Sequence, residues 1–343
     1  MHGGALFLDE VERLVLPIVQ RLQRGIRDRV TAAFRAQGSG ALAAVAGDEG
    51  GDTIYAVDRV SEEVLVAELE REAVGLGGIV LVAEGLECGR VVLPRGQDER
   101  TARYLFIVDP IDGTRGLMYQ KRSAWVLTGV APNVPNARLS DLVLAVQTEI
   151  PLVKQHLADE LWAVRGRGAR AVRTDVLRNE SEPLELTPSR AESIEHGFAM
   201  LTRFFPGARD AIAALDEELV RALLGPLPAG RAACFEDQYI CTGGQLYELM
   251  AGHDRFNADL RPLFDRILAE RGEPPSLTCH PYDMCTALIA QEAGVRVTGP
   301  DGGPLDAPLD VDSKVAWVGY ANPTLAARIE PLLLGALRRR GLL

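Results

Sequence analysis

The sequence predicts a layered α/β fold built from two halves. Its 343 residues exceed the size at which one hydrophobic core usually stops growing, so we expect two subdomains. Apolar residues recur at three- and four-residue steps over residues 6–30, which predicts an amphipathic helix. Two short apolar runs, residues 78–83 and 104–108, predict buried strands, and a carboxylate follows each, Glu84 and Asp109. Ligand sites in α/β folds collect at strand ends, so these carboxylates also predict the place of a site.

The remaining elements of the first half follow from the same patterns. A short β-branched segment, residues 52–58, leads into a helical pattern over residues 61–72. Further strands are expected at residues 124–130, 142–148 and 161–165.

A polar, proline-containing segment, residues 179–190, predicts the domain boundary. We therefore expect an N-terminal α+β domain over residues 1–185 and a C-terminal α/β domain over residues 186–343. The C-terminal domain is expected to contain helices at residues 208–223, 245–251, 282–293 and 323–340, and strands at residues 295–298 and 315–320.

Composition and charge narrow the functional classes. A chain with 47% hydrophobic and 25% charged residues has ordinary globular composition, so a fibrous or disordered protein is not expected. The net charge of −11 repels polyanions, which disfavours nucleic acid and anionic membranes as partners. No apolar run approaches the ~20 residues of a membrane span. Five cysteines without a C-x-x-C pair, and an N-terminus without a signal-peptide pattern, predict a cytoplasmic protein with reduced thiols.

The segment DPIDGT at residues 109–114 is the main chemical signal. It places two carboxylates, Asp109 and Asp112, three residues apart in a turn after an apolar strand. Pro110 fixes one φ angle and Gly113 permits close backbone approach, so both carboxylates and a backbone carbonyl can point at one place. Such an oxygen-rich set suits a hard cation such as Mg²⁺. The structural alternative is an Asx-type turn that caps a helix.

Three other carboxylates carry weaker signals. Asp283 opens an apolar helix that ends at a glycine, and on its own it is explained by the helix dipole. Asp58 ends a short β-branched segment and could cap the following helix. Glu84 opens a loop, where a glutamate is usually solvated.

Taken together, these segments resemble the inositol monophosphatase family, within the larger group that includes fructose-1,6-bisphosphatase. The family's D-P-I-D-G-T motif stands intact at residues 109–114. Its second motif, an aromatic-Asp pair opening a helix that ends in E-A-G, appears as Tyr282-Asp283 with E-A-G at residues 292–294. A D-G-x-P-L-like tail appears at residues 301–305.

Two shorter segments of the family are present in altered form. Its G-E-E segment appears as Ala83-Glu84-Gly85, and its V-T-x-x-D segment spans residues 54–58, with Tyr55 at the threonine position. The resemblance extends over most of the chain. It implies a five-layered α-β-α-β-α sandwich with the active site between the two halves.

The resemblance also implies a metal centre. One Mg²⁺ is expected to bind Glu84, Asp109 and the carbonyl of Ile111, and a second to bind Asp109, Asp112 and Asp283. Gly85 replaces the second glutamate of G-E-E, so a third ion is an open question. Mn²⁺ is expected to substitute for Mg²⁺.

The roles of the other matched residues are carried over in the same way. Gly113 and Thr114 are expected to hold the phosphate, and Asp58 and Thr114 to orient and deprotonate a water for direct in-line attack. Gly243 and Gly244, at a helix start that contacts substrate in this family, are candidate phosphate contacts. Asp259 is the nearest counterpart of the inositol-binding glutamate.

The resemblance therefore implies a Mg²⁺-dependent phosphomonoesterase acting on a small sugar or cyclitol phosphate. The alternatives are a fructose-1,6-bisphosphatase, a 3′-phosphonucleotide phosphatase, or a catalytically weak relative used for regulation or binding. An insertion at residues 260–280 carries three arginines, the only candidates for a second anion site. Members of this family often form dimers, so a homodimer is possible by analogy.

Overall fold

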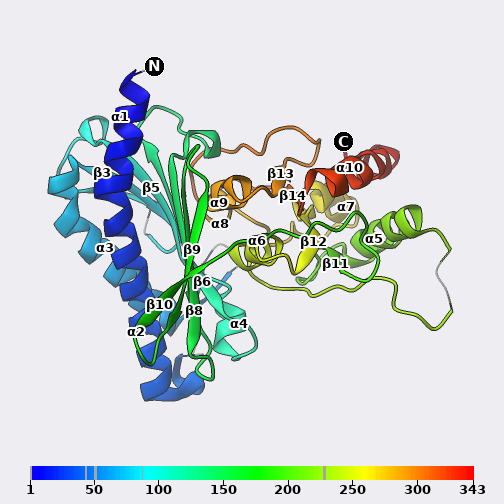
Figure 1. Cartoon of the computed structure of the whole chain (residues 1–343), viewed down its shortest axis with the longest axis horizontal. Helices are drawn as coiled ribbons and strands as arrows, with labels where there is room; N and C mark the ends of the chain where they lie inside the picture. The colour runs from blue at the N-terminus through cyan, green and yellow to red at the C-terminus, as the bar shows by residue number, and fades with distance from the viewer. Residues whose placement is uncertain (1, 43–44, 50–51, 87, 227–228) are drawn as a thin grey trace.

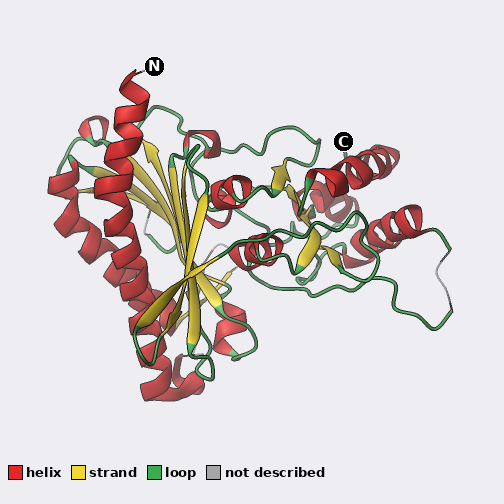
Figure 2. Cartoon of the chain, in the orientation of Figure 1, coloured by secondary structure: helices red, strands yellow, loops and turns green. Residues whose placement is uncertain are grey.

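The structure is a computed structural model that describes residues 2–42, 45–49, 52–86, 88–226 and 229–343; within these ranges the side chains of residues 2–4 and 37–63 are not described. The chain forms five layers in which helices and sheets alternate (Figure 1). Figure 2 shows the large sheet on one side, with helices against both of its faces, and the small sheet on the other side. The predicted α-β-α-β-α sandwich is confirmed.

The larger sheet has eight strands in the order β10-β9-β8-β7-β6-β5-β3-β4. All neighbouring strands are antiparallel except β3 and β5, which run parallel, so their carboxyl ends meet at one edge. The strands are β3 (Ile79–Ala83), β4 (Arg90–Leu93), β5 (Tyr104–Asp112), β6 (Ala124–Pro132), β7 (Leu144–Ile150), β8 (Leu157–Val164), β9 (Ala169–Asp175) and β10 (Glu180–Leu184).

The N-terminal helices cover one face of this sheet. They form a long rod that includes one π-helical stretch, which confirms the helix predicted from residues 6–30, and a second helix that packs beside it. The elements are α1 (His2–Glu10), η1 (Val11–Val15), α2 (Leu16–Leu42) and α3 (Ala56–Leu76), with the separate hairpin β1 (Val45–Glu49) and β2 (Asp52–Tyr55) between α2 and α3.

Short helices cover the opposite face and separate the two sheets. They are α6 (Thr242–Met250), α8 (Pro281–Met284) and α9 (Ala287–Glu292). The second sheet has the order β11-β12-β14-β13, with β11 (Phe198–Leu201), β12 (Asp254–Asp259), β13 (Arg296–Thr298) and β14 (Trp317–Tyr320). Its far face packs against α5 (Arg209–Leu224) and α10 (Pro323–Arg339).

The remaining short elements connect these layers. They are α4 (Thr114–Met118), α7 (Asp265–Glu270) and the 3₁₀ turns η2 (Glu99–Thr101), η3 (Leu139–Asp141) and η4 (Arg261–Phe264). The single helix predicted at residues 282–293 is wrong, because the structure divides it into α8 and α9. Residues 180–184, within the predicted boundary segment, form β10; the domain boundary after residue 185 stays a proposal.

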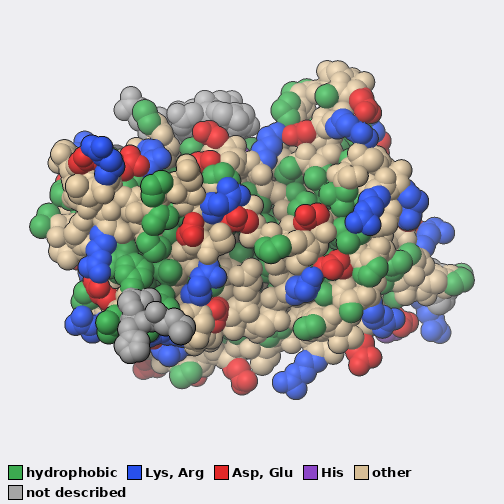
Figure 3. All heavy atoms as spheres, turned by 90° about the horizontal axis from the view of Figure 1, so that it is seen from above, with side chains coloured by type: hydrophobic (Ala, Val, Ile, Leu, Met, Phe, Trp, Pro, Cys, Tyr) green, Lys and Arg blue, Asp and Glu red, His purple; other side chains and the backbone are tan. Residues whose placement is uncertain are grey.

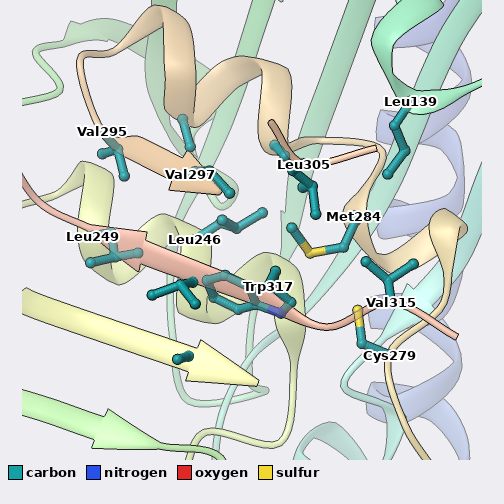
Figure 4. Close-up of a cluster of buried hydrophobic side chains, with 14 of the residues drawn as sticks. Leu139, Leu246, Leu249, Cys279, Met284, Val295, Val297, Leu305, Val315 and Trp317 are labelled. Atoms are coloured by element: carbon teal, nitrogen blue, oxygen red, sulfur yellow. The ribbon is translucent and has the colours of Figure 1, made fainter. Parts of the chain in front are cut away.

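A continuous apolar core joins the short helices to the second sheet (Figure 4). Trp317 of β14 is fully buried in it, among Leu246 and Leu249 of α6. Met284, the last residue of α8, and Cys279, which precedes this helix, also belong to this core. This packing holds α8, and the carboxylate of Asp283 that it carries, against β5 and β6 of the larger sheet.

On the face shown in Figure 3, basic and acidic side chains alternate without a large area of one sign. Among the described residues, no helix combines the length and the apolar character needed to cross a bilayer.

Candidate metal centre and active site

Three aspartates converge at the carboxyl end of β5. Asp109 and Asp112 belong to β5, and Asp283 belongs to α8. Carboxylate oxygens of all three lie within 4.8 Å of one another. The structure thus brings together, from segments about 170 residues apart, the three strongest predicted ligands.

A β-bulge explains why Asp109 and Asp112 point the same way. Residues three apart on a regular strand face opposite sides of the sheet. Between these two aspartates the register shifts, so Asp109 pairs with Leu127 while Asp112 pairs with Trp125. One extra residue on β5 re-aims the second side chain, as bulges commonly do beside active sites.

Backbone donors fix each carboxylate. An oxygen of Asp109 accepts a hydrogen bond from the Ile111 N–H (2.9 Å). Asp112 accepts one from the Gly243 N–H (2.6 Å), and Asp283 accepts one from the His280 N–H (2.6 Å). The three acids are therefore held in place even though their charges repel.

The electrostatics of the cluster are unfavourable for three anions alone. Burial, and then the neighbouring charges of Glu84, Asp112 and Asp283, raise the pKa of Asp109 well above its ordinary value. Burial raises the pKa of Asp112 to about 6, against the opposing effect of its hydrogen bonds. Burial, followed by the charge of Asp112, also raises the pKa of Asp283.

The residues present fit a hard divalent cation. The three carboxylates supply only oxygen donors, which suit Mg²⁺ better than soft metals. Among the described residues, no lysine or arginine forms an ion pair with any of the three. A bound cation would favour the ionised carboxylates and so oppose the burial, and for Asp109 and Asp283 also the repulsion, that raises their pKa values.

The cluster lies in a cavity of about 300 Å³ between the two halves. Glu84, Ile111, Gly113 and Thr114, four further predicted residues, line the same cavity. The Thr114 hydroxyl donates to the Ile111 carbonyl (2.8 Å), so these two groups lie together. Glu84 lies within 3.5 Å of the Tyr282 hydroxyl, in reach of the cluster's field.

Gly113 has a structural reason to be glycine. Its φ of 92° lies in the left-handed region, where side chains are strained. A Cβ there would also lie 2.9 Å from the Cβ of Cys241. The turn after β5 can therefore close against the segment before α6 only without a side chain.

The structure places Gly243 and Gly244 behind the cavity wall. A Cβ on Gly243 would lie 2.6 Å from Leu127, and one on Gly244 would lie 2.2 Å from the ring of Tyr239. These glycines let α6 pack closely on β6 and hold Asp112, which accounts for them without a phosphate. Their predicted phosphate contact stays a prediction.

Asp259 also lies outside the residues that line the cavity. It is 2% exposed and pairs with Arg261, whose own side chain reaches the cavity. Arg261 rather than Asp259 lines the cavity, and the substrate contact predicted for Asp259 stays a prediction. Asp58 lies in α3, and its side chain is outside the described part of the chain.

Phe204, Phe205 and Arg115 also line the cavity, although the sequence assigned them no role there. A signal existed for the first two, because two aromatic residues follow closely after the short apolar run at residues 198–201. That run is β11, a strand that the sequence reasoning did not assign. His280 stacks on Tyr282, with ring centroids 5.2 Å apart.

The cavity's two thiols have structural roles. Burial raises the pKa of Cys241 and of Cys279 well above the ordinary value, so both are neutral thiols. The Cys241 sulfur donates to the Asp112 carbonyl and accepts from the Gly244 N–H (3.2 Å), which caps α6. A thiolate nucleophile is therefore not favoured.

Comparison with known proteins finds similarity in structure only. The sequence matches no protein-family profile, and no characterised protein matches it by sequence. The structure of the extragenic suppressor protein SuhB from Bartonella henselae superposes with a TM-score of 0.63 at 17% identity, covering 93% of this chain and 98% of that one.

Two further structures agree with this. Fructose-1,6-bisphosphatase from Leishmania major gives a TM-score of 0.69 at 15% identity, over 96% of this chain and 95% of that one. The MJ0109 gene product, an inositol monophosphatase and fructose-1,6-bisphosphatase, gives 0.63 at 16% identity, over 92% and 98%. At such identities the likeness establishes the fold, and the chain has the inositol monophosphatase and fructose-1,6-bisphosphatase fold expected from its motifs.

Proposed function

We propose that this protein is a Mg²⁺-dependent phosphomonoesterase. The observation that carries the proposal is the convergence of Asp109, Asp112 and Asp283 in one cavity, with raised pKa values and no ion pair to a described lysine or arginine. Four or more oxygen donors at a strand edge suit the hard cations that phosphoryl transfer needs. The fold that the chain shares with known phosphatases supports the same reaction.

The residues of the chain would hold two cations between them. Glu84, Asp109 and the Ile111 carbonyl would bind one, and Asp109, Asp112 and Asp283 the other. When bound, such cations neutralise phosphoryl oxygens and lower the pKa of water. Whether a third ion binds near Glu84 stays open, since Gly85 supplies no carboxylate.

Positioning of the phosphate would fall to the turn after β5. Gly113 and Thr114 line the cavity beside the carboxylates, so their N–H groups can face phosphoryl oxygens. The Thr114 hydroxyl, which rests on the Ile111 carbonyl, and Asp58 are proposed to orient the attacking water and accept its proton. The P–O ester bond breaks as the water oxygen bonds to phosphorus, and the alcohol leaves with a proton.

The expected substrate is a small phosphomonoester. A sugar or cyclitol phosphate rests on the motif resemblance alone, because Asp259 is paired with Arg261 rather than lining the cavity. The five cysteines are free, which supports the expected cytoplasmic location. A homodimer stays a proposal by analogy.

A phosphate-release assay tests the proposal. The purified chain should release inorganic phosphate from members of a panel of sugar, cyclitol, nucleoside and simple alkyl phosphates when Mg²⁺ is present, and should release none in EDTA. Activity that survives exhaustive chelation would refute the metal mechanism. No release from any ester would favour the catalytically weak relative.

A further inference from the structure

One part of the cavity wall comes from the segments that follow two neighbouring strands of the second sheet, β11 and β12. β11 and β12 run parallel, and the Thr202 N–H continues their pairing by donating to the Ala258 carbonyl (2.8 Å). The segments that follow the two strands therefore emerge side by side. Carboxyl ends of adjacent parallel strands are a common place for ligand contacts.

Phe204 and Phe205 form the first part of this wall. Both rings line the cavity and are half-buried. Their centroids lie 4.8 Å apart at an interplanar angle of 88°, which is an edge-to-face pair. Two adjacent aromatic rings thus line the cavity that also contains the carboxylate cluster.

Arg261 completes the wall from the β12 side. Its guanidinium carbon lies 4.5 Å from the ring centroid of Phe204 and 5.3 Å from that of Phe205. Arg115, which directly follows Thr114, lies 4.9 Å from the centroid of Phe205 on the other flank. We call Arg115, Phe204, Phe205 and Arg261 the Arg–Phe wall.

The charge of Arg261 is already balanced. Its Nε donates to Asp259 (2.9 Å), one Nη donates to the same carboxylate (2.5 Å), and the other donates to the Leu277 carbonyl (2.7 Å). The Arg261 side chain is only 5% exposed. It therefore presents a planar, neutralised surface and is poorly suited to binding a second phosphate.

The other two arginines of the insertion are engaged outside the cavity. Arg266 lies 3.5 Å from Glu270 and donates to the Arg340 carbonyl, and Arg271 pairs with Asp210 at 2.8 Å. Neither is among the cavity residues. Residues 260–280 thus supply no described second anion site, which weakens the expectation of a bisphosphate substrate.

A polyol is also a poor match for this wall. Each hydroxyl of a sugar or cyclitol that is buried needs a hydrogen-bond partner. Phenylalanine rings offer none, and each of the three guanidinium nitrogens of Arg261 already donates one hydrogen bond, to Asp259 or to the Leu277 carbonyl. Flat aromatic and guanidinium surfaces instead favour a planar ring, which they bind by stacking.

From this wall, and building on the phosphatase function proposed above, we infer that the substrate is a phosphomonoester whose alcohol part carries a planar aromatic ring, such as an aryl or nucleobase group. The phosphate would lie at the carboxylate cluster and Thr114, and the ring would stack on the Arg–Phe wall. Phe205 is then a residue that determines specificity.

Two phosphate esters that release alcohols of the same chemical class test whether the protein prefers a planar ring. Benzyl phosphate and cyclohexylmethyl phosphate have the same carbon skeleton and both release a primary alcohol, but only the first has a planar ring. The wild-type protein should show the higher kcat/KM for benzyl phosphate. Phe205→Leu should lower the benzyl-to-cyclohexylmethyl ratio by about 3- to 10-fold, which corresponds to the loss of one aromatic contact.

Control variants separate the contact from a general loss of structure. Phe205→Tyr keeps the ring and should keep the ratio. Phe235→Leu removes an exposed ring that pairs with Phe198 outside the cavity, and should leave the ratio unchanged. Calorimetric binding of benzylphosphonate and cyclohexylmethylphosphonate, which are not turned over, should give the same ranking.

Three outcomes would overturn the inference while leaving the phosphatase function intact. They are a wild-type preference for inositol phosphate over benzyl phosphate, an equal preference for the two matched esters, and an equal loss on both esters in Phe205→Leu. If the wild-type protein releases phosphate from no ester in the presence of Mg²⁺, the proposed function itself fails.

Discussion

The carboxylate of Asp259 and those of Asp109, Asp112 and Asp283 are held beside the same cavity, but their charges are balanced differently. Asp259 has an internal partner, since Arg261 makes two hydrogen bonds to it. Each of the three clustered aspartates accepts a hydrogen bond from a backbone N–H, and none of them forms an ion pair with a described lysine or arginine. The chain therefore supplies its own cation, Arg261, to balance Asp259, whereas no described lysine or arginine pairs with the cluster.

This difference shows which acids are structural and which are available for chemistry. A buried acid with a matched guanidinium is a packing element, and its removal should affect folding. Buried acids without a matched cation repel each other, and substitution of one should affect function more than folding. The predictions below use that contrast.

The largest expected effect is the loss of folding stability when the ion pair between Arg261 and Asp259 is broken. Arg261→Ala leaves Asp259 buried without a partner, which should lower the free energy of unfolding by about 3–5 kcal/mol. The double variant Asp259→Leu/Arg261→Met removes both charges and should be less destabilised than Arg261→Ala. Urea denaturation followed by circular dichroism measures both values. A loss below about 1 kcal/mol in Arg261→Ala would show that the pair is not the packing element described.

Substitution of an aspartate in the cluster should lower activity strongly and change the stability of the fold little. Asp109→Asn or Asp283→Asn removes one charged ligand while nearly keeping the shape. Loss of a residue that merely supports a metal ligand costs ~10–100-fold, so loss of a ligand should lower kcat by more than about 100-fold.

In metal-free protein the same variants should unfold at the same or a higher temperature than the wild type, because one repelling charge is gone. Asp210→Asn, which alters a largely exposed carboxylate, is the matched control and should keep full activity. If a cluster variant retains a tenth of the wild-type kcat, or is strongly destabilised, the three aspartates stabilise the fold rather than hold a metal ion.

Glu149 offers a third case. It is a buried acid that forms no ion pair with a described lysine or arginine and does not belong to the metal cluster. Burial raises its pKa to about 7, and the nearby charge of Asp159 on β8 adds to this. Arg173 lines the same pocket as Glu149, but it pairs with Asp159. Asp159 also accepts a hydrogen bond from the Tyr247 hydroxyl. The Glu149 carboxyl is therefore protonated in the folded state over a range in which it ionises in the unfolded chain.

The direction in which Glu149 changes the free energy of unfolding follows from its pKa in the folded state, about 7, and its lower pKa in the unfolded chain. Below about pH 4.5 both states are protonated and no stability is lost. As the pH rises to about 7, only the unfolded state ionises, so the free energy of unfolding falls, by an amount on the order of 1–3 kcal/mol. Glu149→Gln should gain stability relative to the wild type at pH 8 but not at pH 5. An equal difference at both pH values would contradict the assignment.

The residues of the DPIDGT turn, which the sequence predicted as one group, all line the same cavity in the structure. Asp109, Asp112, Gly113 and Thr114 are consecutive or nearly so, and the conformation of such a turn depends mainly on its own residues. Asp283 was found because it opens a helix, and the start of α8 carries a local signal. The layered fold followed from apolar periodicities and from the motif resemblance.

What the sequence did not reveal depends on contacts between distant segments. The pairing of Asp259 with Arg261, and the stacking of Arg261 on Phe204, arise only when β11 and β12 lie side by side. The break between α8 and α9 coincides with the place where Cys285 packs on β6; a Cβ on Gly129 would lie 2.9 Å from Cys285. Apolar periodicity cannot show such a close approach.

The most direct test of the central claim is calorimetric titration of chelator-treated protein with Mg²⁺. If the three aspartates hold the cation, the wild type should bind Mg²⁺ and Asp109→Asn should bind it at least about 10-fold more weakly. Asp210→Asn should match the wild type. Equal binding by the wild type and Asp109→Asn, or no binding by the wild type, would contradict the assignment of the cluster as a metal centre.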